Sequence, residues 1–462
     1  MYFLLKIQKG LKRKKAALAA WLLLPVVLLL PLSCEDVLEP EPVDRITDDL
    51  VLTDASSVRV VIQNMFRGMA SLNAVRVIAG DMTADLLKNN GTFTQYIELG
   101  THELSASNAS ASAMWGTIYS INYTANFLLE RLPGLEDVLE SQKEQFEAYA
   151  RYFRGYSYFV GAWTFGAMPL VTSTSISENR NIGRTPVDEL LQFAEADLLF
   201  ALNKLPVESF NSGDLTNGAV KATLARFYLY QQNWQEAERF ADEVIAGAGT
   251  ENYVLEQRFA DVLEDFNQES ILEIVYSAND NPGSSASFGL YNLFVDRREV
   301  IPSDQIVFEL QGIGADRDIM INFNAQNIGR GDNGWTVARY GQFSNVPVFR
   351  LAEMYLVRAE ARAQQNELSS ARADLNTIRQ RAGAPASDAS TQNLLLQEIY
   401  NERVVELAFE GHRWYDLKRT GRATAVMNAI TENWSETDLL WPVPLREIQN
   451  NPALSGQQNP GY

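Results

Sequence analysis

The stretch NERVVELAFEGHRWYDLKR, residues 401–419, is the most informative part of this 462-residue chain. It consists mostly of strong helix formers, contains no proline, and has Gly411 as its only weak position, so the pattern predicts one helix throughout. Val405, Ala408 and Phe409 are spaced so that they fall on one side of such a helix. We therefore expect this helix to bury an apolar face against the rest of the protein.

Charged residues alternate with that apolar face. Glu410 and Arg413 are three positions apart, a spacing at which opposite charges can pair on a helix. Glu406 lies about one turn before Glu410. A network of glutamate and arginine inside a helical seam more often holds helices in register than it performs chemistry. We interpret Glu406, Glu410 and Arg413 as structural residues, which identify a fold and not an active site.

Three segments of the chain resemble the C-terminal part of the SusD/RagB family, the surface glycan-binding lipoproteins of Gram-negative outer membranes. Residues 401–419 are similar to its signature, and 439–462, LLWPVPLREIQNNPALSGQQNPGY, resemble its closing segment. Residues 349–385, which begin FRLAEMYLVRAEARAQQN, resemble the helix pair before the signature. The resemblance implies a mainly α fold, a SusD-like α-α superhelix of tetratricopeptide-repeat helix pairs with an irregular insertion of loops and short strands.

Two segments carry the pattern of such a repeat. In the first, Ala222, Ala225 and Leu229 are spaced along one side of a predicted helix, and a second helix follows after a turn. The segments 351–364 and 368–381 repeat this design, with small residues that let antiparallel helices approach closely. Because each pair needs neighbours to bury its faces, we expect at least three pairs.

The first 46 residues have the composition of an export signal followed by a tether. Residues 1–33 combine a basic start with an apolar run, which is typical of a signal peptide. The only cysteine, Cys34, follows directly, and we expect it to be lipidated. Residues 34–46 are acidic and contain proline, so we predict an extended linker. Acidic residues behind a lipidated cysteine resemble a signal for the outer face of the outer membrane, where we expect the protein to be anchored.

Beyond the linker we predict a single SusD-like domain, residues 47–462. Its first part, 47–249, is helical in pattern. The part 250–345 no longer has a helical pattern. It contains the β-like run ESILEIVY and turns rich in glycine, and we predict that it is an irregular binding insertion. The part 346–462 carries the family signature.

The net charge limits the partners of the protein. The chain has 39 basic and 58 acidic residues, a net charge of −19. A chain that starts at Cys34 loses six basic and no acidic residues, which leaves 33 basic and 58 acidic residues and a net charge of −25. Such a surface repels phosphate backbones, so we expect no nucleic acid partner. The charge fits a binder of neutral ligands better.

The sequence lacks the motifs of common catalytic and metal sites. His102 and His412 are the only histidines, and neither has the spacing of a zinc ligand. No G-x-S-x-G elbow and no phosphate-binding loop occurs. We therefore expect that the protein is not an enzyme and binds no cofactor and no metal. A pair of catalytic carboxylates, as in a glycosidase, has no local motif, so the sequence neither reveals nor excludes such a pair among the 58 acidic residues.

Two segments, 80–112 and 250–345, combine turn formers with isolated aromatic residues, as exposed binding loops do. A sugar presents apolar CH faces ringed by hydroxyl groups, so its binder needs flat rings and polar side chains. We predict that the rings of five residues stack on the ligand: Phe93, Tyr96, Tyr291, Trp335 and Tyr340. We predict that four side chains contact its hydroxyl groups: Asn89, Asn90, Asn324 and Arg339. The alternative for each aromatic residue is a solvent-exposed ring without a ligand or packing in the core.

The resemblance implies a cell-surface nutrient-binding lipoprotein. Members of the family capture oligosaccharides and pass them to a SusC-like TonB-dependent outer-membrane transporter, over which they close as a lid. Two alternatives stay open: uptake of oligopeptides, as the RagB side of the family implies, and a repeat scaffold that binds only proteins.

Overall fold

The computed structural model describes residues 52–247, 252–276, 289–312 and 315–462. The predicted signal peptide 1–33, Cys34 and the linker 34–46 lie outside these residues, as does the Pro/Gly/Ser-rich stretch 280–287. Residues 53–462 group into one unit of structure, which is described below. Among the described residues, no helix combines the length and the apolar character that crossing a membrane requires.

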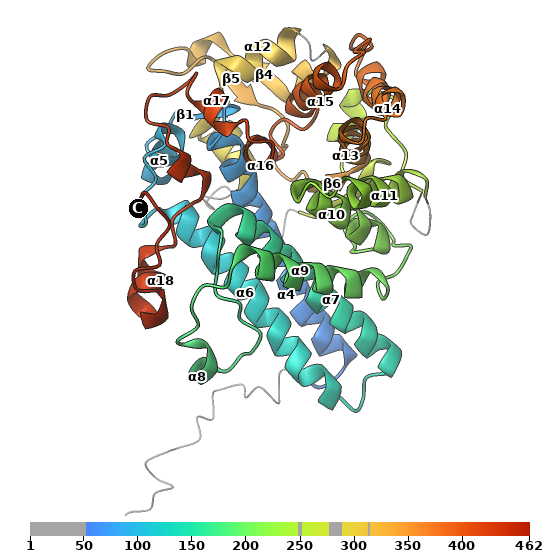
Figure 1. Ribbon diagram of the computed structural model, residues 1–462, viewed down its shortest axis with the longest axis vertical. Helices are drawn as coiled ribbons and strands as arrows, with labels where there is room; N and C mark the ends of the chain where they lie inside the picture. Colours follow the sequence, from blue (N-terminus) through green and yellow to red (C-terminus); the bar gives the residue numbers. More distant parts are fainter. Residues whose placement is uncertain (1–51, 248–251, 277–288, 313–314) are drawn as a thin grey trace, which may run out of the picture. The chain divides into compact units, whose positions relative to one another are not determined.

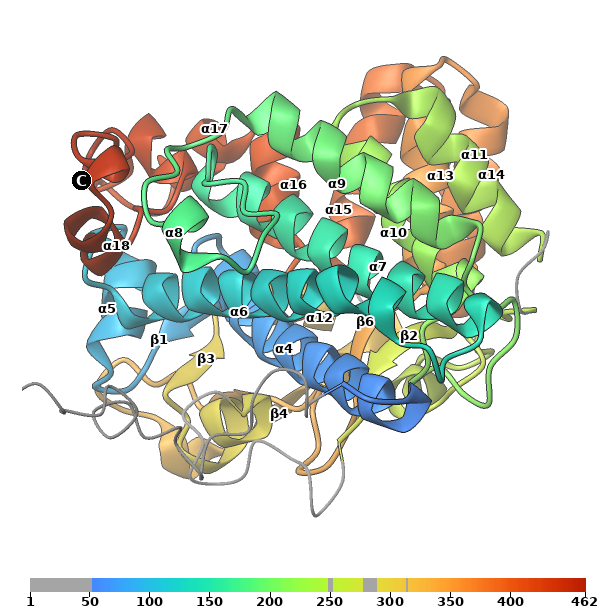
Figure 2. The same cartoon turned by 90° about the horizontal axis from the view of Figure 1, so that it is seen from below.

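Four long helices form the first part of this unit. They are α4 (Ala55–Met82), α6 (Ala109–Arg131), α7 (Glu140–Phe165) and α9 (Val187–Leu202), and they pack side by side (Figures 1 and 2). Asp54 begins α4 by accepting hydrogen bonds from two backbone N–H groups of its first turn. The buried Arg154 of α7 links the layer, since its Nε lies 2.7 Å from Asp197 of α9.

The predicted helix pairs are present. The first pair is α10 (Asn217–Tyr230) and α11 (Trp234–Ile245), and the second is α13 (Leu351–Gln364) and α14 (Leu368–Arg381). The predicted inward residues Ala222, Ala225 and Leu229 have no exposed surface. Helix α11 packs on both α10 and α13, so the pairs stack one on the next, and α15 (Gln392–Glu406) packs against α13 and α14 (Figure 1). The fold is that of a tetratricopeptide-like helical protein.

The described strands form three antiparallel two-stranded sheets, and two of them join distant parts of the chain. Strand β1 (Leu87–Asn89) pairs with β3 (Val300–Pro302), with Asn89 opposite Val300. Strand β2 (Ser270–Ile274) pairs with β6 (Val346–Arg350). The third sheet is a hairpin of β4 (Ile321–Phe323) and β5 (Trp335–Val337). Short helices connect the strands: η2 (Phe259–Leu263), η3 (Asn292–Asp296), α12 (Asp304–Gly312), η4 (Ala315–Met320) and η5 (Ala325–Asn327).

The remaining described elements are short. They are α5 (Thr94–Thr101), η1 (Leu132–Gly134), α8 (Ile176–Asn179), α16 (Arg413–Arg419), α17 (Ala423–Met427), η6 (Glu436–Leu439), α18 (Leu445–Asn450) and η7 (Pro452–Leu454). The interpretation of 80–112 as a loop throughout is wrong, because α4 extends into this segment, β1 and α5 lie within it, and α6 begins before its end. Asn89, Phe93 and their neighbours are therefore held by regular elements.

The prediction of one helix over 401–419 is also wrong. Helix α15 ends at Glu406 and α16 begins at Arg413, with a turn at residues 407–412 between them. Within this turn, Phe409 and Gly411 have φ values of 66° and 76°. Arg76 of α4 donates hydrogen bonds of 3.0 Å to the carbonyl oxygens of Glu410 and Gly411, which are no longer bonded within a helix. The contact with α4 thus overrides the helix propensity of the sequence.

Candidate functional site

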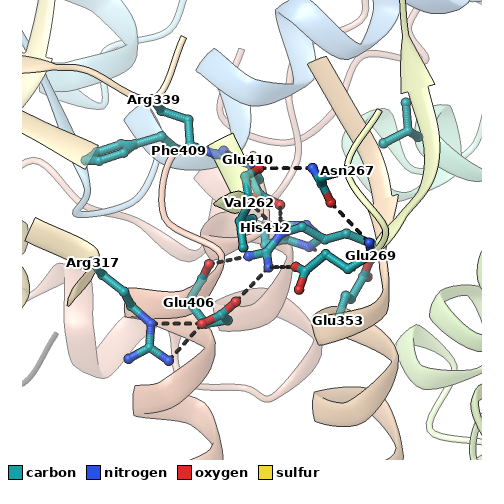
Figure 3. Close-up of polar contacts among 12 residues, drawn as sticks. Val262, Asn267, Glu269, Arg317, Arg339, Glu353, Glu406, Phe409, Glu410 and His412 are labelled. Atoms are coloured by element: carbon teal, nitrogen blue, oxygen red, sulfur yellow. Dashed lines mark hydrogen bonds and ion pairs between the residues drawn. The ribbon is translucent and has the colours of Figure 1, made fainter. Parts of the chain in front are cut away.

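Glu406 and Glu410 of the signature segment, residues 401–419, belong to a buried network of charged side chains (Figure 3). Glu406 is the centre of this network and contacts Arg317, Arg350 and Arg381. Its Oε1 lies 2.6 Å from Nη1 of Arg350, and its Oε2 lies 2.8 Å from Arg317. Burial by itself raises the pKa of Glu406, but the three guanidinium groups hold that pKa well below its usual value.

A second carboxylate, Glu410, joins this network to the strands. Its Oε1 accepts hydrogen bonds from Arg339 at 3.0 Å and from Arg350 of β6 at 2.9 Å. The predicted pair of Glu410 with Arg413 does not form, because the turn separates them, and Arg413 instead binds Asp85 at 2.6 Å. Since the Glu410 and Arg350 side chains are at most 4% exposed, these groups have no access to a ligand and fix elements in place.

Neither histidine is placed for chemistry. His412 is buried, and burial together with nearby arginines lowers its pKa well below 6.5, so it is neutral. Burial lowers the pKa of His102 to about 4, and its ring lies edge-on to Trp434. Within the part of the chain that the structure describes, no group of three or more His, Cys, Asp or Glu residues is arranged to hold a metal ion.

Three of the nine predicted binding residues lie in the core. Tyr96, Arg339 and Tyr340 are 2%, 5% and 3% exposed. Tyr340 donates a 2.7 Å hydrogen bond to the carbonyl oxygen of Phe409, and Arg339 belongs to the buried network. The side chains of these three residues make internal contacts. For the two tyrosines, this is the packing that the sequence analysis gave as an alternative to ligand binding. We therefore leave these three out of the candidate site.

The other predicted residues lie on or beside the strands that join the two predicted segments. Strand β1 comes from the first segment and pairs with β3 of the insertion, and β3 packs on β5. Asn90, directly after β1, donates hydrogen bonds from Nδ2 to the carbonyl oxygen of Arg298 at 2.9 Å and to Oδ2 of Asp332 at 3.4 Å. The Arg297 guanidinium lies 4.6 Å from the centre of the Phe93 ring. Residues more than 200 positions apart thus meet here.

Two apolar residues that the sequence did not single out extend this region. Phe323 of β4 is opposite Trp335 of β5, with ring centres 5.0 Å apart and planes inclined by 50°. Phe323 is 46% exposed, and Ile328 in the connection between the strands is 60% exposed. A signal was present, because an aromatic residue on each side of a glycine-rich turn is typical of a hairpin. Asn324 is exposed beside Phe323, and Tyr291 precedes η3, which packs on β3 and β5.

We call this region the β1–β5 surface. It consists of Asn89, Asn90, Phe93, Tyr291, Arg297, Arg298, Phe323, Asn324, Ile328, Asp332 and Trp335. Strand β1 is labelled next to α5 in Figure 1, β4 and β5 are labelled next to α12 there, and β3 is labelled in Figure 2. It combines exposed or half-buried rings with side-chain amides, the two kinds of group that the sequence analysis expected of a sugar site.

An ion pair fixes the hairpin to β3. Nη2 of Arg298 lies 2.8 Å from both carboxylate oxygens of Asp332, and Nη1 of Arg298 donates to the Thr336 hydroxyl. Asp332 also accepts a 2.8 Å hydrogen bond from the backbone N–H of Gly334. Partial burial raises the pKa of Asp332, but the hydrogen bonds from Arg298 and Gly334 outweigh burial and lower that pKa overall. Asp332 is therefore ionised at neutral pH.

A separate cavity of about 370 Å³ lies beside the first half of α4. Its lining includes Phe66 and Arg67 of α4, Asp214, and Tyr276 after β2. Glu273 also lines it, but the Glu273 carboxylate already accepts hydrogen bonds from the Phe266 N–H and from Asn345. None of the predicted binding residues lines this cavity.

Two family models match the chain. The model described as the SusD family matches residues 320–462, and one described as "Starch-binding associating with outer membrane" matches residues 44–229. The two matches do not overlap, and between them they include the helical layer, the hairpin and the signature segment.

Individual proteins are similar over the same range. SusD-like protein P25 of Formosa agariphila is 27% identical over an alignment of 519 positions, gaps included, that covers 93% of this chain and 97% of that protein. The starch-binding protein SusD of Bacteroides thetaiotaomicron is 34% identical over an alignment of 129 positions that covers 26% of this chain and 22% of that protein.

Solved structures share the fold. A SusD superfamily protein of Bacteroides thetaiotaomicron superimposes with a TM-score of 0.78 at 22% identity, over 88% of this chain and 100% of that chain. A protein described as a laminarin-binding SusD-like protein superimposes with a TM-score of 0.77 at 24% identity, over 89% of this chain and 100% of that one.

Proposed function

Since the chain belongs to the SusD/RagB family of glycan-binding proteins, we propose that it captures oligosaccharides outside the cell and delivers them to a SusC-like TonB-dependent transporter. The observation that carries the binding step is the meeting of two distant segments of the chain, where β1 pairs with β3 and Asn90 contacts Asp332, which lies between the strands that carry Phe323 and Trp335. The chemistry of this surface suits a sugar better than a charged or purely apolar ligand.

The aromatic residues supply the apolar part of the binding. Phe323 and Trp335 present two inclined rings, and a pyranose ring has an apolar CH face that stacks on such rings. Asn90 directly follows β1 and Asn324 directly follows β4, and side-chain amides of this kind can hydrogen-bond hydroxyl groups at the rim of a sugar. Tyr291 and Phe93 extend the surface for further sugar units.

The protein acts by binding and not by hydrolysis. A glycosidase needs one carboxylic acid that keeps its proton near neutral pH and a second carboxylate across the sugar. On the β1–β5 surface, Asp332 is held ionised by Arg298. Glu299, which directly follows Arg298, accepts hydrogen bonds from Arg297 at 3.0 Å and from the Thr92 N–H at 3.0 Å. Both carboxylates thus serve to position arginines and backbone.

We place the protein on the outer membrane through a lipid on Cys34. Support comes from the predicted signal peptide that precedes this single cysteine and from the similarity to a family associated with the outer membrane. Replacing Cys34 with serine removes the lipid attachment point, so we expect the variant to move from the membrane fraction to the soluble fraction of lysed cells. Unchanged fractionation of Cys34→Ser would contradict this placement.

The function is tested by titration calorimetry of the full chain, purified in detergent, against laminarin oligosaccharides, starch oligosaccharides and a panel of oligopeptides. We expect saturable binding of at least one oligosaccharide and no binding of the peptides. Binding of peptides alone would favour the RagB-like alternative, and no binding in either panel would favour a scaffold that contacts only proteins.

A further inference from the structure

The charged side chains on and around the β1–β5 surface balance one another. Four are basic and four are acidic: Lys88, Arg297, Arg298, Arg330, Asp296, Glu299, Asp304 and Asp332. Three of the basic groups lie within ion-pair distance of an acidic one, at 2.8 Å for Arg298 and Asp332, 3.0 Å for Arg297 and Glu299, and 3.2 Å for Lys88 and Asp304. The surface therefore offers little net positive charge to a ligand.

The Arg298–Asp332 pair is the least accessible of the three. The two side chains are 14% and 13% exposed, and the pair is bidentate on the carboxylate. Arg298 also donates to Thr336, while Asp332 accepts from Asn90 and Gly334. An anionic ligand would have to take Arg298 away from a partner that is already well oriented, which removes most of the gain from the new contact.

Arg297 is restrained in a similar way. Its partner Glu299 is only 8% exposed and also accepts the Thr92 N–H, while the Arg297 guanidinium lies over the Phe93 ring. Two further exposed residues, Arg330 in the connection between β4 and β5 and Asp296 at the end of η3, complete the equal count of basic and acidic groups. The internal residues outside the described ranges, 248–251, 277–288 and 313–314, contain no lysine or arginine. The long-range field of a chain with a net charge of −25 after Cys34 adds repulsion of anions.

We propose that the β1–β5 surface selects uncharged oligosaccharides and excludes uronic-acid or sulfated ones, with Asp332 as the specificity-determining residue because it neutralises Arg298. This inference rests on the proposed function, since it names the ligand class of the same surface. It predicts that the specificity changes when the neutralising carboxylate is removed while the side-chain shape is kept.

The test compares one glucan with its own carboxymethylated form. The probe is laminarin or soluble starch, whichever binds the full-length protein more tightly, and both forms are titrated at low and at physiological salt. We expect the wild-type protein to bind the carboxymethylated form about tenfold or more weakly than the neutral form. Because salt screens repulsion between exposed charges, this difference should narrow as the salt concentration rises.

The variant Asp332→Asn keeps the shape of the side chain and frees the charge of Arg298. We expect it to bind the carboxymethylated glucan about tenfold more tightly than wild type does. Glu236→Gln is the matched control, because it also removes one carboxylate from an arginine, Arg239, on the exposed side of α11. Glu236→Gln should prefer the neutral glucan over the carboxymethylated one as the wild-type protein does. Asp332→Glu keeps the carboxylate and should show that preference too.

The outcomes separate this inference from the proposed function. If the wild-type protein binds the carboxymethylated glucan as tightly as the neutral one, oligosaccharide capture stands and the selection of uncharged ligands is overturned. If the wild type binds neither form, both proposals fail. If the melting curve shows that Asp332→Asn folds poorly, the affinities of the wild-type protein for the two glucans still decide whether the surface selects uncharged ligands.

Discussion

Glu406 has no contact with water and lies between three guanidinium groups, Arg317, Arg350 and Arg381. Each arginine comes from a different element, so one carboxylate fixes the positions of η4, β6 and α14 relative to α15. A buried ion pair adds little net stability, because both charges lose their contact with water. Removing one partner is costly, because the other charge is then buried alone.

Replacing Glu406 with glutamine keeps the size of the side chain but removes the charge that three buried arginines share. We expect Glu406→Gln to lower the free energy of unfolding by about 3–5 kcal/mol, measured by urea denaturation. The control Glu236→Gln breaks an exposed pair and should change that free energy by less than about 1 kcal/mol. Equal effects of the two substitutions would contradict the structural role of Glu406.

For single residues, the sequence predicted which ones are structural better than it predicted their contacts. It correctly identified Glu406 and Glu410 as structural, but their arginine partners are 25 to 89 positions away and carry no local signal. Likewise, Trp335 and Tyr340 looked equally suited to a ligand, yet Tyr340 is buried under the turn at 407–412 while Trp335 reaches the surface. Composition cannot distinguish these outcomes, because aromatic rings serve both roles.

Among the elements, α4 and the turn at 407–412 make the closest approach. A Cβ atom on Gly80 would lie 2.3 Å from the carbonyl oxygen of Gly411, and one on Gly411 would lie 2.7 Å from the carbonyl oxygen of Arg76. The two backbones therefore touch near the end of α4, which ends at Met82. Strand β1 begins five residues later, at Leu87. This contact sets the position of β1, and with it that of Asn89 and Asn90.

Gly80→Ala should force this contact apart. We expect it to lower the free energy of unfolding by about 1–3 kcal/mol, because the added methyl group meets backbone atoms that have no room to move. Gly116→Ala is the matched control in the middle of α6, where a Cβ meets nothing within 4 Å. It should raise the same free energy by about 0.5–1 kcal/mol, since alanine is the better helix former. A Gly80→Ala protein as stable as wild type would show that the contact is not tight.

Helix pairs such as α13 and α14 were predictable because their spacing repeats within a few turns. The break in the helix after Glu406 was not, since it depends on Arg76 and Asp81 of α4, which bind the carbonyl and N–H groups of the turn from more than 300 positions away. The pairing of β1 with β3 has the same origin, because three-residue strands carry no pattern of their own.

For the molecule as a whole, the helical layers hold β1 and its neighbours next to the insertion that carries β3, β4 and β5. The sequence placed the candidate residues in these two segments, but it did not predict the strand and helix within 80–112. It did not reveal that the hairpin of β4 and β5 places Phe323 against Trp335, or that Arg298 and Asp332 neutralise each other. The central claim is that an oligosaccharide binds at this surface and not in the cavity beside the first half of α4.

Titration of the tightest-binding oligosaccharide into Trp335→Ala tests that claim most directly. Loss of one stacking ring should weaken binding about tenfold or more. The control Tyr123→Ala removes an aromatic side chain that is 52% exposed on α6 and should leave the affinity unchanged. An affinity for Trp335→Ala equal to that of wild type, in a protein with an unchanged melting curve, would show that the sugar binds elsewhere.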